Sequence, residues 1–257
     1  MAKTIVVDVK HIFKSYLIGN EKFIAINDVS FQIESGKFII FFGPSGCGKS
    51  TLLNMISGLE TIDKGTIKIR GEDISKFSPN ELAKYRRTKI GIVYQQFNLI
   101  KDLTITENVA LPLLADGRPK AQAINRAHSL LRTFGLGDHL NKKPTELSGG
   151  QQQKVAMARA LAANPWIIIA DEPTGNLDSK SAEEIINILN ILNKKSRRTI
   201  IMVTHNPEYL KIAHQVMYMK DGKIVREQKN PNPKGVSEQI KGFNLKDLEK
   251  TITKEQK

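Results

Sequence analysis

The feature that most constrains the fold is a glycine-rich turn between an apolar run and a helical pattern. Residues 37–42 form an apolar strand, residues 43–50 contain the turn, and residues 51–56 show helical spacing. A strand, a turn and a helix in this order make half of a parallel βαβ unit. The chain of 257 residues is long enough to bury a sizeable core around such a unit. We therefore expect an α/β fold with a mixed core sheet around the turn.

The turn itself fits the phosphate-binding loop pattern. It consists of Gly43, Pro44, Ser45, Gly46, Cys47, Gly48, Lys49 and Ser50, with Thr51 next. Glycines let successive backbone N–H groups turn inward around a β-phosphate, while Lys49 reaches the β- and γ-phosphates and Ser50 ligates Mg²⁺. A chance match occurs in roughly one chain in a hundred, and the flanking strand and helix supply the context that the mechanism demands. The sequence thus predicts a nucleoside triphosphate site.

Two carboxylates and a histidine follow later apolar runs, which we expect to be buried strands at residues 166–170 and 199–203. Ligands of open parallel sheets bind at the carboxyl ends of strands. Asp171 there would hold Mg²⁺, largely through water, and Glu172 would orient and polarise the attacking water. His205 would contact the γ-phosphate from the same edge. We interpret the remaining histidines, His11, His128, His139 and His214, as structural.

A second glycine-rich turn lies before another helical pattern. It reads Leu147-Ser148-Gly149-Gly150-Gln151. Ser148 and Gln151 have capping-box spacing, so one interpretation is a well-capped helix. The other is a second anion site, because a helix N-terminus with two glycines exposes N–H donors to a phosphate.

Three further patterns complete the expected architecture. Residues 4–34 and 66–70 alternate in part, as half-exposed antiparallel strands do. Residues 104–163 are expected to be mostly helical, and Thr104 and Glu107 have capping-box spacing at their start. Asp221-Gly222 predicts a hairpin turn. We expect one domain at residues 1–230 with a helical subdomain at about 96–163, and a charged tail at 231–257 after a Pro-Asn break.

The charge and the apolar runs limit the classes of function. The formal net charge is +13, which indicates either a solvated basic face or attraction to the negative cytoplasmic leaflet. Nucleic acid is disfavoured as a partner, because aromatic residues make up 6% and no basic stretch is interleaved with them. No apolar run approaches the roughly 20 residues that span a bilayer, and the N-terminus lacks a secretory pattern. One cysteine, Cys47, fits a reducing cytoplasm.

The order of the motifs resembles the ABC ATPases over about residues 4–225. It runs through the phosphate loop at Gly43, Gln95, the LSGGQ signature at Leu147, Asp171-Glu172, Gly175-Asn176-Leu177-Asp178 and His205. The resemblance implies Mg²⁺-dependent hydrolysis of ATP, with Tyr16 stacked on adenine and Gln95 touching Mg²⁺ and the lytic water. It also implies a homodimer in which Ser148 and Gly150 grip the γ-phosphate of the opposite subunit's ATP, while Asp178 communicates across the dimer.

Three longer stretches, residues 94–99, 106–113 and 173–181, are similar to the macrolide-export and lipoprotein-release group. That group implies an exporter or mechanotransmission complex, with the ATPase bound to an integral-membrane permease at the cytoplasmic face of the membrane. Three alternatives stay open: a cell-division-like ATPase that moves no substrate, a soluble ABC protein of DNA repair or translation, and an importer subunit. Lys154 departs from the arginine usual after the signature, which keeps the charge but loses bidentate geometry.

Overall fold

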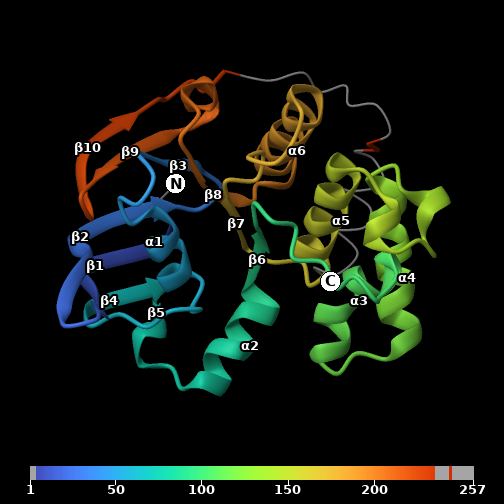
Figure 1. The fold of residues 1–257 in the computed structure, drawn as a ribbon, viewed down its shortest axis with the longest axis horizontal. Coiled ribbons are helices and arrows are strands. Elements are labelled where there is room, and N and C mark those ends of the chain that lie inside the picture. The colour runs from blue at the N-terminus through green and yellow to red at the C-terminus, as the bar shows by residue number, and fades with distance from the viewer. Residues whose placement is uncertain (1–3, 235–242, 245–257) are drawn as a thin grey trace. The chain divides into compact units, whose positions relative to one another are not determined.

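The structure is a computed structural model that describes residues 4–234, 243 and 244. It divides into two compact units, and their helices and strands are labelled in Figure 1. Among the described residues, unit 1 comprises 4–86 and 197–234, and unit 2 comprises 87–196 with 243 and 244. Within the described ranges no helix combines the length and the apolar character that a bilayer crossing needs.

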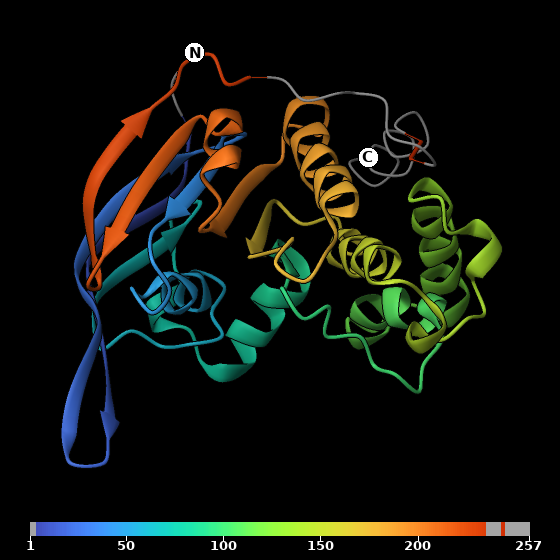
Figure 2. The ribbon, with the colours of Figure 1, turned by 45° about the horizontal axis from the view of Figure 1, so that its top comes forward.

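Unit 1 contains the antiparallel sheet that the alternating residues predict. Its strands are β1 (Ile5–Ile18), β2 (Glu21–Glu34), β4 (Lys64–Ile69) and β5 (Glu72–Asp73), in the order β2-β1-β4-β5. The β1–β2 hairpin extends beyond the rest of this sheet as a two-stranded ribbon (Figure 2). The apolar side chains of Leu17 and Ile18 near its tip are 81% and 65% exposed.

A second, mixed sheet in unit 1 surrounds the glycine-rich turn, as predicted. Its strands are β3 (Phe38–Phe42), β8 (Thr199–Thr204), β9 (Gln215–Lys220) and β10 (Lys223–Lys229), in the order β10-β9-β3-β8. β3 runs parallel to both neighbours, and α1 (Lys49–Ile56) follows it. Asp221 and Gly222 join β9 to β10 with positive φ angles of 47° and 73°, so the predicted hairpin turn is confirmed.

Unit 2 combines a parallel strand pair with helices. Its strands are β6 (Ile90–Val93) and β7 (Ile167–Asp171), and its helices are α3 (Ile105–Ala115), α4 (Lys120–Thr133), α5 (Gly149–Leu161) and α6 (Ser179–Ser196), with short 3₁₀ turns at Gly137–His139 and Pro144–Glu146. The chain between the two strands is mostly helical, as expected, and α3 begins with the predicted Thr104–Glu107 capping box. Helices α3, α4 and α5 pack against one another (Figure 1).

Helix α2 (Pro79–Lys89) was not predicted, because its pattern is almost wholly polar. Tyr85 is its one buried residue, and the Tyr85 hydroxyl donates a hydrogen bond of 2.9 Å to the carbonyl of Ile56. That burial raises the pKa of Tyr85 far above its usual value. A signal for the helix start was present, since Ser78 and Glu81 have capping-box spacing and the Glu81 carboxylate accepts from the Ser78 N–H.

Part of the expected tail packs against unit 2. The ring of Phe243 meets that of Phe134 edge to face, with centroids 5.3 Å apart. The Asn244 N–H donates to the carbonyl of Thr133 at the end of α4, at 2.9 Å. Residues 231–234 are also described, but most of the tail at 231–257 lies outside the described residues.

Candidate functional site

The glycine-rich turn begins at the carboxyl end of β3. Phe42 pairs in parallel register with Thr204 of β8 and with Tyr218 of β9, so Gly43 lies at the edge of this sheet. A Cβ atom on Gly43 would lie 2.2 Å from the carbonyl oxygen of Met219. Only glycine therefore fits where the turn leaves the strand.

Backbone conformation sets the rest of the turn. Gly46 and Gly48 have φ angles of 78° and 98°, in the left-handed region that glycine enters at least cost. A Cβ atom on Gly48 would also lie 2.4 Å from the carbonyl oxygen of Ala25. The glycines are thus required by conformation and by close backbone approach, as the phosphate-loop interpretation assumes.

Lys49 places a positive charge inside the turn. Its side chain is buried, and Nζ donates to the carbonyl oxygens of Gly43 at 3.0 Å and Pro44 at 2.7 Å. Gly48, the N-cap of α1, supplies no side-chain hydrogen bond to the helix start. Because glycine has no side chain to cap the helix, the N-terminus of α1 is open to a ligand. Together with the Lys49 ammonium, it attracts phosphate. Ser45 and Ser50 are exposed at this turn, and Thr51 is half-buried.

His205 lies at the same sheet edge as the turn. It follows Thr204, which is paired with Phe42 in the β3–β8 register, and its side chain is exposed. The register therefore brings Gly43 and His205 to neighbouring strand ends, as predicted from the two apolar runs.

Tyr16 lies on β1 opposite Phe23 of β2. Its ring is half-buried, and the Nζ of Lys14 lies 5.3 Å from the ring centroid. The aromatic side chain that the family resemblance assigns to adenine is thus held on the β1–β2 hairpin of unit 1.

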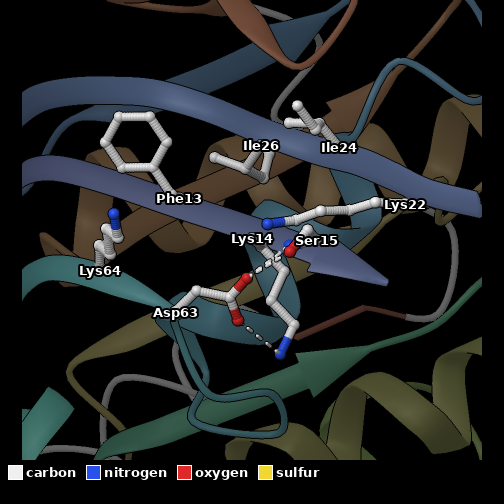
Figure 3. A pocket seen from close by; sticks show the side chains of 8 residues that line it. All are labelled: Phe13, Lys14, Ser15, Lys22, Ile24, Ile26, Asp63 and Lys64. Carbon is white, nitrogen blue, oxygen red and sulfur yellow. Dashed lines mark hydrogen bonds and ion pairs between the residues drawn. The ribbon is translucent and has the colours of Figure 1, made fainter. Parts of the chain in front are cut away.

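A small cavity of about 120 Å³ lies beside the same hairpin (Figure 3). It is lined by Phe13, Lys14, Ser15, Lys22, Ile24, Ile26, Asp63 and Lys64. The Asp63 carboxylate accepts hydrogen bonds from the N–H and hydroxyl of Ser15 at 2.8 and 2.7 Å. These bonds, the hydroxyl's foremost, lower the pKa of Asp63. Asp63 therefore links the turn that contains it to β1. The lining of the cavity includes no residue predicted for the nucleotide site.

In unit 2, the β6–β7 register aligns a second group of predicted residues. Val93 pairs with Ala170, so Gln95 and the Asp171-Glu172 pair follow neighbouring strand ends. Asp171 and Glu172 are half-buried, and Gln95 is exposed. Glu172 has a φ angle of 45°, a left-handed conformation that costs a non-glycine residue free energy and that recurs at functional sites.

The chain after Glu172 packs against Gln95. The Gly175 N–H donates to the Glu172 carbonyl at 3.1 Å, and the Asn176 amide donates to the Gln95 carbonyl at 3.2 Å. A Cβ atom on Gly175 would lie 2.6 Å from Nε2 of Gln95. Gly175 thus leaves the room that the Gln95 side chain occupies.

The signature turn forms the predicted capping box at the start of α5. The Ser148 N–H donates to Oε1 of Gln151 at 3.0 Å, and the Gln151 N–H donates to the Ser148 hydroxyl at 3.4 Å. A Cβ atom on Gly150 would lie 2.5 Å from the hydroxyl oxygen of Ser181, and one on Gly149 would be 3.6 Å from the ring of Phe97. The structure confirms the cap, and it gives Gly150 a packing reason that the sequence does not reveal.

Asp178 begins helix α6. Its carboxylate accepts from the N–H groups of Lys180 and Ser181 at 3.1 and 3.0 Å. The Ser181 side chain and N–H are the main causes that lower the pKa of Asp178. Within one chain Asp178 therefore acts as a helix cap.

Lys154, the departure from the usual arginine, has a partner within unit 2. Its Nζ lies 2.7 Å from the carboxylate of Glu184 on α6. This ion pair needs one positive charge and no bidentate geometry, so a lysine is sufficient to link α5 to α6.

Two polar side chains of α5 were missed by the sequence analysis. Gln153 is fully buried, and its amide donates to the carbonyls of Tyr94 and Pro173. Arg159 donates to the carbonyls of Phe97 and Asn98, and burial lowers the pKa of its guanidinium. No local pattern marks either residue, since their acceptors come from distant segments.

The comparisons with known proteins agree with this geometry. The model of a family described as ABC transporter matches residues 26–175. An uncharacterized ABC transporter ATP-binding protein of Methanocaldococcus jannaschii, MJ1508, is 51% identical over 219 residues, which are 85% of this chain and 97% of the relative. The macrolide export ATP-binding/permease protein MacB of Aggregatibacter actinomycetemcomitans is 41% identical over 222 residues, 86% of this chain but 34% of the relative.

A solved structure is similar over nearly the same range. The ATP-binding cassette MJ0796, in a dimeric post-hydrolysis state bound to ADP and Pi, superposes with a TM-score of 0.81 at 43% identity. The match covers 87% of this chain and 98% of the cassette. It confirms the predicted fold class, a phosphate-loop core with an antiparallel β-subdomain and an inserted helical subdomain.

Proposed function

The chain belongs to the ABC transporter family as an ATP-binding protein, and on that premise we propose that it hydrolyses ATP with Mg²⁺ to drive a membrane partner. Two strand registers support the proposal. The β3–β8 register gathers Gly43 and His205 at one sheet edge in unit 1. The β6–β7 register gathers Gln95 and the pair at 171–172 at a strand edge in unit 2.

Unit 1 would bind the nucleotide. The backbone donors of residues 43–51 surround the β-phosphate, and Lys49 moves its ammonium from the carbonyls of Gly43 and Pro44 to phosphate oxygens. Tyr16 stacks on adenine. The exchange of carbonyl for phosphate acceptors favours binding, because the ammonium then pairs with an opposite charge instead of a neutral carbonyl dipole.

Magnesium suits the remaining ligand set. Mg²⁺ takes oxygen ligands, and proteins usually supply one or two of them beside substrate phosphates and waters. The Ser50 hydroxyl, the Gln95 amide and the Asp171 carboxylate offer such oxygens. The bound ion would neutralise charge that develops on the phosphates.

Hydrolysis would depend on positioning and charge. Glu172 accepts a hydrogen bond from the attacking water and orients it toward the γ-phosphate, Gln95 contacts the same water, and His205 donates to the γ-phosphate.

Replacing the proposed base tests the reaction. The Glu172→Gln variant should bind ATP like the wild type but lose turnover by about 10²-fold or more, because an amide does not polarise the water. Steady-state ATPase activity and ATP affinity measure the two effects. Turnover near that of the wild type would remove Glu172 from this role.

We propose further that each site is shared by two chains in a homodimer. Ser148, Gly149, Gly150 and Gln151 form an anion site that a nucleotide bound to a second chain would reach, and Asp178 would contact that chain. The dimeric structures of MJ0796 support this arrangement.

Mixing two defective chains tests the shared site. A Lys49→Ala chain lacks the phosphate lysine, and a Ser148→Arg chain blocks the signature. In their mixed dimer one composite site carries both lesions and the other carries none. The mixture should therefore form ATP-dependent dimers that trap nucleotide in one site, while neither variant does so alone. If the mixture fails as the separate chains do, with folding confirmed, the shared site is wrong.

The partner that we propose is an integral-membrane permease at the cytoplasmic face of the membrane. MacB, whose name combines the ATP-binding and permease functions, supports it. The contact surface would begin after Gln95, at residues 97–113, where Ile100 is 42% and Leu111 is 37% exposed. A contiguous exposed apolar patch with a polar rim often marks an interface.

A mechanical complex that moves no substrate is the second candidate, since its ATPase would need the same site. A flux assay with the copurified permease separates the two functions.

We assign the ATPase domain to residues 1–230, its helical subdomain to about 96–163, and the charged tail to 231–257. The Phe243 contact with Phe134 indicates that the tail also adds to the stability of the helical subdomain.

A further inference from the structure

One fully buried amide connects the two segments that hold the proposed hydrolytic residues. Gln153 lies in the second turn of α5, with 0% of its surface exposed. Its Nε2 donates to the carbonyl oxygen of Pro173 at 2.6 Å and to that of Tyr94 at 3.2 Å. Pro173 directly follows Glu172, and Tyr94 directly precedes Gln95.

The polarity of this side chain needs an explanation beyond filling space. An apolar residue of similar volume, such as methionine, would fill the same position without the free-energy cost of burying an amide that lacks a partner. Gln153 does bear part of that cost, because its Oε1 is buried without a hydrogen-bond partner among the described residues. Both hydrogen bonds of the Gln153 side chain described above come from its Nε2 donor.

The two acceptors lie where the strand ladder stops. Val93 and Ala170 form the last pair between β6 and β7, so beyond them the ladder no longer fixes the spacing of the two chains. Gln153 bridges the carbonyls at 94 and 173 just past that point. Together with the bond from the Asn176 amide to the Gln95 carbonyl, it therefore holds the two backbones that carry Gln95 and Glu172 at their separation.

A second side chain of α5 contacts the segment that contains Gln95. Arg159, also on α5, donates to the carbonyls of Phe97 at 2.8 Å and Asn98 at 2.6 Å. Asn98 has a φ angle of 50°, a conformation that a non-glycine residue keeps only when its surroundings hold it. Ser148 caps the start of α5. The helix that carries the signature turn at its N-terminus therefore also holds the backbone before and after Gln95.

We propose that Gln153 is a positioning residue for hydrolysis, which spaces Gln95 and Glu172 for the lytic water and links both to the signature helix. This inference depends on the proposed roles of those two residues. The side-chain hydrogen bonds of Gln153 go to Tyr94 and Pro173, which both belong to unit 2. The loss of Gln153 should therefore reduce turnover while nucleotide affinity stays intact.

The experiment compares the same substitution at two adjacent glutamines. Gln153→Met keeps the side-chain volume and removes the donors. Gln152→Met is the matched control, because Gln152 is half-buried on the same helix and its side-chain amide donates to the carbonyl of Leu147, at 3.1 Å. We expect Gln153→Met to lower kcat at least about tenfold, since small misplacements of reacting groups have effects of this size. Its KM for ATP should stay within about twofold, and Gln152→Met should keep both values.

Rates are expressed per folded molecule, counted from the amplitude of thermal unfolding, because a chain that hydrolyses ATP does not retain it. If Gln153→Met does not fold, Gln153→Asn replaces it, because asparagine keeps the amide but is one methylene too short to reach both carbonyls. A variant that loses thermal stability but keeps the wild-type kcat shows a structural role only and overturns the inference. An equal loss of kcat in Gln152→Met overturns it as well.

Glu172→Gln, assayed in parallel, separates this inference from the proposed function. If Glu172→Gln turns over ATP like the wild type, the proposed function fails, and the inference with it. If Glu172→Gln is inactive while Gln153→Met keeps the wild-type kcat, the hydrolytic site stands and only the positioning role is wrong.

Discussion

The turn at residues 43–50 and the signature turn at residues 147–151 both place glycines before a helix, yet different interactions hold them. In the first, Gly46 and Gly48 have positive φ angles, and the N-cap supplies no side-chain bond. In the second, neither Gly149 nor Gly150 has a positive φ angle, and the reciprocal Ser148–Gln151 cap closes the helix start.

The difference shows how each turn suits its proposed ligand. The phosphate loop keeps its donors for a ligand through a backbone shape that only glycine adopts at low cost. The signature turn is shaped by its own side chains, and its glycines allow neighbours to approach: Ser181 lies against Gly150 and Phe97 against Gly149. The same residue type therefore has a conformational role in one turn and a steric role in the other.

The largest effect should come from a methyl group added to each turn. Gly48→Ala places Cβ 2.4 Å from the Ala25 carbonyl at a φ angle of 98°, which should cost at least about 1–3 kcal/mol and abolish tight ATP binding. Gly149→Ala meets only ordinary contacts, 3.6 Å away, and should fold like the wild type. Thermal unfolding and nucleotide binding measure both variants. Equal destabilisation would erase the contrast between the turns.

An intermediate effect is expected from the cap. Ser148→Ala removes the acceptor of the Gln151 N–H and should lower the free energy of unfolding by about 1 kcal/mol. Ser148→Thr keeps a hydroxyl at this position and serves as the control. Denaturant unfolding of the two variants measures the difference. If the alanine variant is as stable as the threonine variant, the cap does not hold the signature turn.

The smallest effect is expected from a comparison of the capping boxes that begin α3 and α5. In α3 the reciprocal partner is the carboxylate of Glu107, whose pKa the Thr104 N–H and hydroxyl lower; in α5 it is the neutral amide of Gln151. A lowered folded pKa gives stability above the unfolded pKa, and this stability is lost as pH falls through the folded value. Glu107→Gln should therefore flatten the loss of thermal stability between about pH 5 and pH 3 and change little at neutral pH. An unchanged acid slope would contradict this assignment.

Much of the fold could be predicted because its signals are local. The apolar runs of β3, β7 and β8, the Asp221-Gly222 turn and the Thr104–Glu107 cap each lie within a few residues of chain. Helix α2 escaped prediction because Tyr85 is its one buried residue, which leaves no apolar stripe to detect. The roles assigned to the site residues stay predictions until the variants above are measured.

Glycine conformations and capping bonds involve neighbouring residues, so local sequence is enough to predict the phosphate-loop pattern, the caps and the order of the family's motifs. Only the tertiary structure decided what Lys154 pairs with and what the buried Gln153 binds. The Gln153 acceptors lie 59 and 20 residues away in the chain, and its neighbours Gln151 and Gln152 look the same in sequence. A buried polar side chain is defined by the partners that folding brings to it, and no local pattern encodes them.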